Sequence, residues 1–442
     1  MQARPLDIAV IGGGIAGLVA AWQLAARHRV TLFERHAAPG FIASSVAVPV
    51  PGRGPGEPPL RVDVPLRVFY PGYYPTLTRL YAELGVATQP VNYATTFTDA
   101  DGQAYFRWRN LCLGDASWPY VLPQDVASAR ARRLVAGALR FQTQARGALA
   151  TGALRGISIG EFVATLALPA EFVDGLLLPA LATIATCTTA DARAYPAEVV
   201  AGYAAAGMAR QSVRRVREGA DAVAARLLAG VQRVLCSARV VAVHGPSNAH
   251  ERGAWVQHAG GRERFDHVIF ATQANQALAL LPEASAEERA VLAAFRYRAL
   301  EVVMHRDTAL MPARRSAWSS VNACIGAAFE RPESTIWINR VQPGLRHAAP
   351  LFQTVMPQRA PREDSVIGRA RFERPLLDAG TAAALARLRQ LQTQPGRRLW
   401  FCGSYAEDGV PLLESAARSA LAVAAAVAAA PVASGLAAVS MA

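Results

Sequence analysis

Several features common in proteins are scarce or absent in this sequence of 442 residues. It contains no lysine, so arginine provides all 46 basic side chains behind the net charge of +13. Its five cysteines are odd in number and form no Cys-x-x-Cys pair, which indicates neither a zinc site nor a disulfide framework. We therefore expect no bound metal and a reducing compartment. The cysteines are Cys112, Cys187, Cys236, Cys324 and Cys402.

The pattern also lacks segments typical of export or of a membrane span. No basic and apolar leader precedes the first predicted strand at Asp7, so we expect a cytoplasmic protein without a secretory signal. The alanine-rich stretch beyond Ser415 is interrupted by Pro431, and alanine is too weakly apolar for a convincing span. That stretch predicts a helix followed by a frayed tail at 431–442.

The excess of arginine makes the protein basic, which limits the partners that we expect. Abundant Ala, Arg and Gly also reflect GC-rich coding. No nucleic-acid-binding module is recognisable and arginine does not interleave with aromatic residues, so we expect no nucleic acid partner. A basic surface instead favours anionic lipid head groups, an acidic carrier protein or an acidic substrate. A location peripheral to the inner membrane therefore stays open.

The composition predicts a folded protein of two domains. Hydrophobic residues make up 52% and charged residues 18%, enough apolar surface to offset the entropy of the chain. A chain of 442 residues exceeds the size at which one hydrophobic core usually keeps growing.

The most informative pattern is a glycine turn between a strand and a helix, DIAVIGGGIAGLVAAWQLAARHRVTLFE, at residues 7–34. A short buried strand is predicted at Asp7–Ile11. Gly12 permits a tight turn, Gly14 lets the backbone approach a pyrophosphate, and Gly17 allows the helix to pack closely on the strand. The helix presents free N–H groups and the positive end of its dipole to the phosphates.

The second strand of this unit, at Val30–Phe33, is followed by an acid. Glu34 lies 20 residues after Gly14, where its carboxylate would bind a ribose 2′-hydroxyl and repel a 2′-phosphate. The unit predicts a dinucleotide site, but the same fingerprint serves FAD and NAD. Because the turn begins almost at the start of a long chain, the sequence resembles flavoprotein oxidoreductases of the glutathione-reductase-like class, in which FAD lies along this first unit.

The next part of the chain alternates a loop, short strands and helices. A stretch rich in Pro and Gly at 49–59 predicts an exposed loop, and residues 62–69 predict a pair of strands. Apolar residues at helical spacing predict a helix from about Tyr74 to Leu84, capped by Gly85. From Pro123 to Gly207 the pattern is mainly helical.

One helix in that region, SARARRLVAGALRFQTQARGAL at 128–149, carries both arginines and apolar residues. It fits either an ordinary helix with a core face and a solvated face or a helix on a membrane surface. Alternating β-branched residues predict strands from Gln232 to Thr272. Residues 296–374 alternate strands and loops, and residues 399–429 give a strand, a loop and a closing helix.

Four stretches resemble the flavin-containing amine oxidase and phytoene-desaturase superfamily, and the resemblance covers nearly the whole chain. Within that superfamily the sequence is most similar to a bacterial subgroup of FAD-dependent oxidoreductases associated with cyclopropane or modified fatty-acid synthesis. The stretches are RVDVPLRVFYPGYYPTLTRLYAELGVAT (61–88), FDHVIFATQANQALALL (265–281), MHRDTALMPARRSAWSSVN (304–322) and FCGSYAEDGVPLLESAARSAL (401–421).

The resemblance implies an α/β protein with a Rossmann-like, glutathione-reductase-like FAD-binding domain and a discontinuous α+β substrate domain. It assigns residues 1–75, 212–280 and 385–430 to the FAD-binding domain. Residues 76–211 and 281–384 would form the substrate domain. The implied cofactor is FAD.

The resemblance also implies which residues surround the FAD. The glycine turn would approach the pyrophosphate, Glu34 the ribose, and the backbone of Val240 the adenine. The C-terminal residues would approach the ribityl chain or the flavin, although Gly403 and Ser415 also fit a plain turn and a helix cap. The implied residues are Gly12, Gly13, Gly14, Ile15, Ala16, Gly17, Glu34, Arg35, Val240, Thr272, Gly403, Glu414, Ser415 and Ala416.

The sequence departs from the subgroup at three places. It has Pro39-Gly40 where the subgroup has a pair richer in glycine, and Asp-Val-Pro-Leu at 63–66 in place of Asp-Thr-Gly-Phe. It has Tyr-Ala-Glu-Asp-Gly at 405–409 in place of a Gly-Phe-His-Glu-Asp-Gly run. Contacts to the flavin ring and the substrate therefore do not follow from the resemblance, whereas the N-terminal unit supports FAD independently.

Catalytic side chains are weakly indicated, because a flavin itself accepts the hydride and a base is not compulsory. The candidates are His305, with Asp307 beside it in sequence, and Tyr405. A hydrogen-bonded structural histidine explains His305 as well, and Glu407 and Asp408 fit a solvated loop. Four aromatic residues fit either a substrate tunnel or a packed core. They are Phe69, Tyr70, Tyr73 and Tyr74.

These observations favour an FAD-dependent desaturase or oxidase that removes a hydride from a hydrophobic, acyl-type substrate. A flavin amine oxidase is the alternative, but many of those enzymes hold a water near the flavin with a lysine, and this chain has none. A non-catalytic flavin-binding partner protein is a third possibility. An NAD-dependent dehydrogenase would need a second nucleotide site, which the sequence does not indicate.

Overall fold

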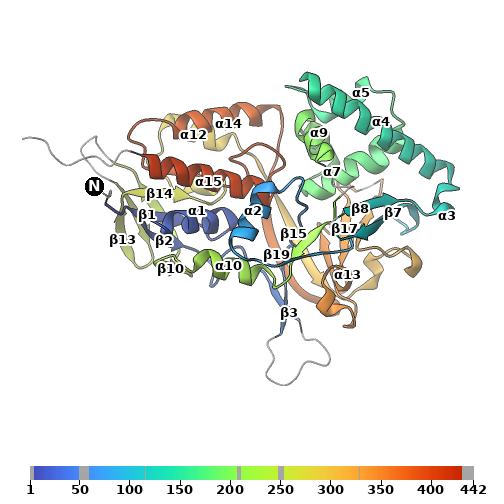
Figure 1. The fold of residues 1–442 in the computed structure, drawn as a ribbon, viewed down its shortest axis with the longest axis horizontal. Coiled ribbons are helices and arrows are strands. Elements are labelled where there is room, and N and C mark those ends of the chain that lie inside the picture. Colours follow the sequence, from blue (N-terminus) through green and yellow to red (C-terminus); the bar gives the residue numbers. More distant parts are fainter. Residues whose placement is uncertain are drawn as a thin grey trace, which may run out of the picture.

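The computed structural model describes residues 4–48, 59–114, 116–206, 211–246, 253–327 and 329–430. The predicted loop at 49–59, apart from Pro59, and the predicted tail at 431–442 lie outside this part of the chain. Figure 1 shows two lobes side by side. One is built on a parallel sheet and is called the Rossmann lobe; the other is built on a mixed sheet and is called the mixed-sheet lobe.

The Rossmann lobe contains five parallel strands in the order β10-β2-β1-β14-β20. The predicted first strand is confirmed at Asp7–Ile11, and the predicted second strand begins one residue earlier than expected. Apart from β1 and β2, neighbouring strands of this sheet come from distant parts of the chain. The strands are β1 (Asp7–Ile11), β2 (Arg29–Phe33), β10 (Arg233–Leu235), β14 (His267–Phe270) and β20 (Leu399–Phe401).

Both faces of this sheet are buried, which is why its strands read as continuous apolar runs. Ile8 and Val10 face a core formed with helices α1 (Ile15–Ala25), α2 (Pro75–Glu83), α10 (Ala220–Leu228) and α15 (Leu413–Ala429). Ala9 and Ile11 point the other way. That second core contains β11 (Val240–His244), β12 (Ala254–His258), β13 (Gly261–Phe265), α11 (Ala274–Ala279), α12 (Ala286–Ala293) and α14 (Ala379–Gln392). Most of α2, all of α12 and the first part of α14, which the sequence analysis assigned to the substrate domain, thus pack in the Rossmann lobe.

The mixed-sheet lobe contains eight strands in the order β19-β15-β18-β17-β16-β6-β7-β8. Only the contact between β16 and β6 is parallel among the described pairs of this sheet. The strands are β6 (Thr95–Thr98), β7 (Ala104–Leu113), β8 (Ala116–Tyr120), β15 (Tyr297–His305), β16 (Val321–Cys324), β17 (Glu333–Trp337), β18 (Phe352–Val355) and β19 (Val366–Pro375).

Helices cover one face of this sheet, as the pattern from Pro123 onward predicts (Figure 1). The arginine-bearing helix is α4, which buries Leu134 and Phe141 in that helical core, so it has the ordinary core face. The helices are α3 (Pro123–Val126), α4 (Ala129–Thr151), α5 (Ile159–Thr165), α6 (Ala170–Phe172), α7 (Leu178–Ala185), α8 (Thr189–Ala194) and α9 (Ala197–Ala205), with the short α13 (Ile338–Val341) elsewhere in the lobe.

Two local predictions need comment. The helix predicted from Tyr74 to Leu84 is α2, and Gly85 follows it with a φ of +63°. The strand pair predicted at 62–69 is wrong, because β4 (Leu60–Val62) pairs with β3 (Val46–Val48). The remaining two-stranded sheet joins β5 (Thr88–Pro90) to β9 (Arg214–Val216).

No helix among the described residues is long and apolar enough to cross a lipid bilayer. Nor do the described residues include a group of three or more His, Cys, Asp or Glu side chains that could hold a metal ion.

Candidate dinucleotide site and adjoining cavity

The glycine turn joins β1 to α1 as the sequence predicts. Gly12 has a φ of +105°, which favours glycine, and its N–H donates to the carbonyl of Phe33 at 2.8 Å. A Cβ at Gly17 would lie 1.8 Å from the carbonyl oxygen of Gly12, whereas a Cβ at Gly14 would meet nothing within 4 Å. Helix and turn are therefore in the closest contact at Gly17, and the space in front of Gly14 is open.

The start of α1 offers N–H groups without a partner inside the helix. Its first intrahelical bond runs from Leu18 N to Gly14 O at 3.0 Å, and no side chain caps it. The N–H groups of Ile15, Ala16 and Gly17 therefore lack an intrahelical acceptor. An uncapped helix start facing open space is suited to an anion such as a pyrophosphate.

Glu34 lies at the end of β2 and is almost fully buried, at 4% exposure. Its Oε2 accepts hydrogen bonds from the N–H of Gly13 at 2.8 Å and of Gly40 at 3.1 Å, and its Oε1 accepts from His36 N at 2.8 Å. A Cβ on Gly13 or Gly40 would lie 2.9 Å from Oε2. The carboxylate thus holds the turn in place, and it lies where the sequence predicts a group that binds a ribose. The sequence pattern did not predict its contact with Gly40.

The other predicted residues converge from three distant segments. A Cβ on Gly12 would lie 3.3 Å from Thr272 Cγ2, and one on Gly403 would lie 3.4 Å from the carbonyl oxygen of Thr272. The N–H of Gly403 donates to Ser419 Oγ at 2.9 Å, which fixes the end of β20 to α15. Val240 begins β11 and is half-buried. Arg35 is exposed, and its Nε donates to His36 Nε2 at 3.2 Å.

At the start of α15 the side chains are already engaged. Glu414 accepts hydrogen bonds from Thr76 N at 3.0 Å and Leu77 N at 2.9 Å, so its carboxylate caps α2. Ser415 Oγ donates to the carbonyl of Val410 at 2.9 Å. Ala416 N donates to Leu412 O at 3.1 Å, inside the first turn. Any contact from this helix start to a cofactor would therefore use backbone N–H groups.

A cavity of about 230 Å³ lies inside the mixed-sheet lobe and reaches the Rossmann lobe at Leu412, immediately before α15. Its lining is mainly aliphatic and aromatic and contains no Asp or Glu among the described residues. Phe69, Tyr70 and Tyr74 line it, whereas Tyr73 does not; the hydroxyl of Tyr73 accepts a hydrogen bond from Val410 N at 2.7 Å. Further aromatic lining residues are Tyr93, Phe97, Trp108 and Tyr203.

Neither catalytic candidate lies among the residues that line the cavity. His305 is fully buried, its Nε2 lies 2.7 Å from Thr354 Oγ1, and its Nδ1 accepts from Asp307 N at 3.1 Å. Burial lowers the pKa of His305 to about 4. Tyr405 is also buried and packs edge-on against Phe295 with ring centres 4.9 Å apart. The structure thus places both in packed interiors.

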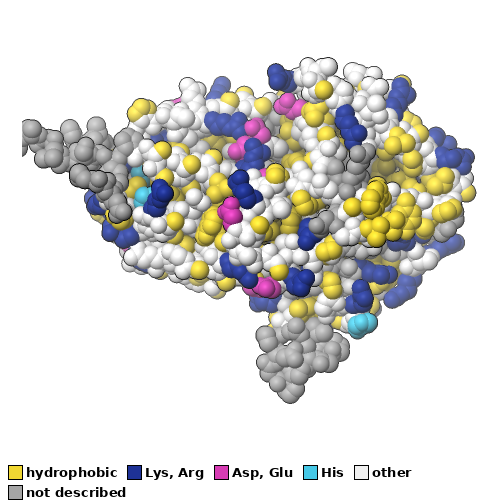
Figure 2. Space-filling view, viewed as in Figure 1, with side chains coloured by type: hydrophobic (Ala, Val, Ile, Leu, Met, Phe, Trp, Pro, Cys, Tyr) yellow, Lys and Arg dark blue, Asp and Glu magenta, His cyan; other side chains and the backbone are white. Residues whose placement is uncertain are grey.

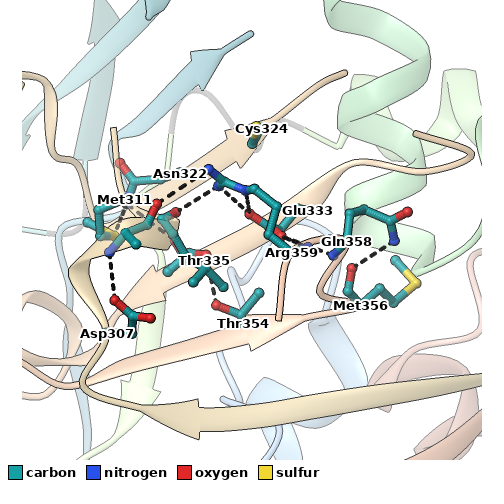
Figure 3. Close-up of polar contacts among 12 residues, drawn as sticks. Asp307, Met311, Asn322, Cys324, Glu333, Thr335, Thr354, Met356, Gln358 and Arg359 are labelled. Atoms are coloured by element: carbon teal, nitrogen blue, oxygen red, sulfur yellow. Dashed lines mark hydrogen bonds and ion pairs between the residues drawn. The ribbon is translucent and has the colours of Figure 1, made fainter. Parts of the chain in front are cut away.

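Polar groups on β17, on β18 and in the loop after β18 form hydrogen bonds with one another (Figure 3). Glu333 is fully buried, and its Oε2 accepts hydrogen bonds from Gln358 N at 3.0 Å and Arg359 N at 2.9 Å. Its Oε1 accepts from Arg359 Nε at 3.0 Å. Thr354 Oγ1 lies 2.8 Å from Thr335 Oγ1. This network holds strands β17 and β18 to the loop after them.

Comparisons with known proteins agree with this architecture. A family model described as an NAD(P)-binding Rossmann-like domain matches residues 10–84. No curated protein matches the sequence.

Several solved structures match nearly the whole chain at low sequence identity. A CLA-producing fatty acid isomerase from P. acnes is 14% identical, with a TM-score of 0.66 over 96% of this chain and 99% of that chain. Putrescine oxidase bound to putrescine is 15% identical, with a TM-score of 0.65 over the same shares. Cyclohexylamine oxidase from Brevibacterium oxydans is 15% identical, with a TM-score of 0.63, also over 96% and 99%. These likenesses confirm the fold that the sequence predicted.

Proposed function

We propose that the chain is an FAD-dependent oxidoreductase that removes a hydride from a hydrophobic, acyl-type substrate. The observation that carries the proposal is the position of the apolar cavity. Leu412, the residue immediately before α15, is among its lining residues, and no side chain caps that helix start. A flavin held by the backbone there would lie next to the cavity.

The described residues fit FAD at three places, the start of α1, Glu34 and the start of α15. The N–H groups at the uncapped start of α1 would bind the pyrophosphate, in the open space before Gly14. Glu34 would bind the ribose, and the backbone at the start of α15 would bind the flavin. FAD, when bound, supplies the acceptor for the hydride. The aromatic side chains of the cavity would exclude water and hold the reacting carbon in place.

Two other functions compete with this proposal. Putrescine oxidase and cyclohexylamine oxidase share the fold, so an amine oxidase is the alternative. The lysine-free sequence and the apolar lining favour an acyl substrate over a small amine. A non-catalytic flavin-binding partner protein would have the same dinucleotide site.

Anaerobic spectroscopy of the purified, FAD-loaded protein distinguishes these functions. We expect the flavin absorbance to bleach on addition of a candidate acyl lipid and to persist with amines such as putrescine or cyclohexylamine. Rapid bleaching with amines and none with lipids would reject the acyl proposal. A colourless protein that takes up no FAD would reject both enzymatic functions.

We also propose that the β7–β8 hairpin docks on an anionic lipid surface. Leu111 lies opposite Trp118 in the hairpin, and Arg109 lies opposite Tyr120. Leu111, Leu113, Trp118 and Tyr120 are between 45 and 66% exposed. Where Figure 1 places β7 and β8, Figure 2 shows hydrophobic side chains together with basic ones.

The basic side chains near the hairpin support an anionic surface over a neutral one. Arg132 donates to the carbonyls of Val126 and Ala127, and Arg340 stacks over Trp337 with its guanidinium 5.0 Å from the ring centre. Neither of them, nor Arg109, forms an ion pair within the described part of the chain. Exposed apolar residues flanked by unpaired cations are typical of proteins that bind anionic bilayers.

Vesicle flotation tests this surface. The protein is expected to float with vesicles that contain an anionic phospholipid and to remain behind with purely zwitterionic vesicles. A variant with Leu111→Ser, Leu113→Ser and Trp118→Ser should bind about tenfold or more weakly, because it removes apolar area that would enter the bilayer. Val241→Ser, at a residue 48% exposed on β11, is the matched control and should bind like the wild type. Equal flotation of the triple variant would contradict the proposal, as would capture by an acidic protein without any vesicle binding.

A further inference from the structure

The cavity contains one charged side chain, Arg374, among its described lining residues. Arg374 is the last residue but one of β19, where that strand leaves the mixed sheet toward the Rossmann lobe. The other polar lining groups are hydroxyls and the amide of Gln353. Since no Asp or Glu is among these described lining residues, the charge on the cavity wall is positive.

The contacts of Arg374 leave its charge without a counterion. Its Nη1 donates to the carbonyl of Pro411 at 3.2 Å, and no carboxylate within the described residues forms an ion pair with it. Burial lowers the pKa of Arg374, but a guanidinium remains protonated in proteins. An isolated buried charge is costly unless an opposite charge joins it.

The neighbouring charged side chains have polar partners elsewhere. Glu373, the preceding residue, accepts a hydrogen bond from Asn275 Nδ2 at 3.3 Å. Arg298, opposite Arg374 on β15, forms an ion pair with Asp191 at 2.7 Å. Arg67 is held by the carbonyls of Phe41 and Pro65. Among the described lining residues Arg374 alone is charged, and no described carboxylate forms an ion pair with it.

We propose that Arg374 binds an anionic group of the substrate, a carboxylate, so that the cavity accepts an apolar acid and rejects an amine. This inference rests on the proposed function, because it takes the cavity as the substrate site. A guanidinium can bind both oxygens of a carboxylate with two parallel hydrogen bonds. An ammonium group would find no acid in the cavity and would be repelled by Arg374. The aromatic walls would enclose the hydrocarbon part of the acid.

A series of three eight-carbon probes tests the inference without turnover. Octanoate, octanol and octylamine differ only in the polar end, and calorimetry at neutral pH measures their binding to the full-length protein as purified. We expect octanoate to bind about tenfold or more tightly than octanol, because a charge-assisted pair replaces a neutral contact. Octylamine should bind most weakly of the three. Octylamine binding more tightly than octanoate would overturn the inference.

Substitutions test whether Arg374, and not another arginine, binds the carboxylate. Arg374→Gln should remove the preference for octanoate and leave octanol binding unchanged, whereas Arg374→Lys should restore part of the preference. Arg371→Gln is the matched control, because this arginine lies on the same strand with its side chain 88% exposed. Unchanged octanoate binding in both Arg374 variants would contradict the assignment.

The absorbance of FAD measures its uptake by the same samples. If the protein takes up no FAD but binds octanoate through Arg374, the oxidoreductase proposal fails and the anion site stands. If lipid bleaches the flavin while octanoate binding is independent of Arg374, the anion site fails and the oxidoreductase proposal stands.

Discussion

Gly17→Ala is expected to destabilise the protein by about 3 kcal/mol or more, because the new Cβ would lie 1.8 Å from the carbonyl oxygen of Gly12. The obstacle is backbone, so no side chain can rotate away. The helix would have to move off β1, which would open the core shared by α1, α10 and α15. Thermal unfolding, monitored by circular dichroism, measures the loss of stability.

Gly14→Ala is the matched control in the same turn. Gly14 has φ −70° and ψ 177°, an extended conformation that alanine adopts, and its Cβ would point into open space. Stability should be unchanged or raised by up to about 1 kcal/mol, because alanine has less freedom in the unfolded chain. The methyl group would nevertheless stand where the pyrophosphate approaches, so FAD affinity should fall about tenfold or more. A Gly17→Ala protein that melts with the wild type, or a Gly14→Ala protein with full FAD affinity, would show that the turn does not work as described.

Glu34→Ala is expected to cost about 3 kcal/mol of the free energy of unfolding, because three N–H groups would lose their acceptor. The buried position allows water to replace the carboxylate only in part. Glu34→Gln should cost less, since it keeps one acceptor oxygen, but its amide N–H groups would face the N–H donors of the turn. Urea unfolding at neutral pH gives both values.

The control for this pair is Glu83→Ala, at the end of α2. Glu83 forms only a surface ion pair with Arg79 at 3.7 Å, with its side chain 52% exposed, so its removal should change stability by less than about 0.5 kcal/mol. If Glu34→Ala unfolds at the same urea concentration as Glu83→Ala, the carboxylate does not hold the turn.

The part of the fold that depends on short-range pattern could be predicted from the sequence. The strand at Asp7–Ile11, the glycine turn and the acid at Glu34 form one continuous unit, in which each residue constrains its near neighbours. Alternation of burial and helical spacing located α2 and the helical region for the same reason. The strand pair predicted at 62–69 was wrong because the partner of β4 is β3, which lies before residue 49.

Contacts between distant segments could not be predicted. Glu414 caps α2 across 338 positions of sequence, and no local pattern distinguishes that role from contact with a cofactor. His305 sits beside Asp307 in sequence as a catalytic pair would, but its ring lies in a satisfied network away from the cavity. No sequence motif marks Arg374 as a functional residue. Its significance comes from the absence of Asp and Glu among the described residues that line the cavity, which only the three-dimensional arrangement reveals.

The order of strands in the parallel sheet has a consequence for synthesis on the ribosome. That sheet begins with β1 at residue 7, but its edge strand β20 ends at residue 401 and α15 follows it. All eight strands of the mixed sheet lie between residues 95 and 375. During synthesis the mixed sheet is therefore complete before β20 and α15 are available to pack with β1, β2 and α1. The dinucleotide cradle is made before the mixed sheet and is among the last parts to be enclosed.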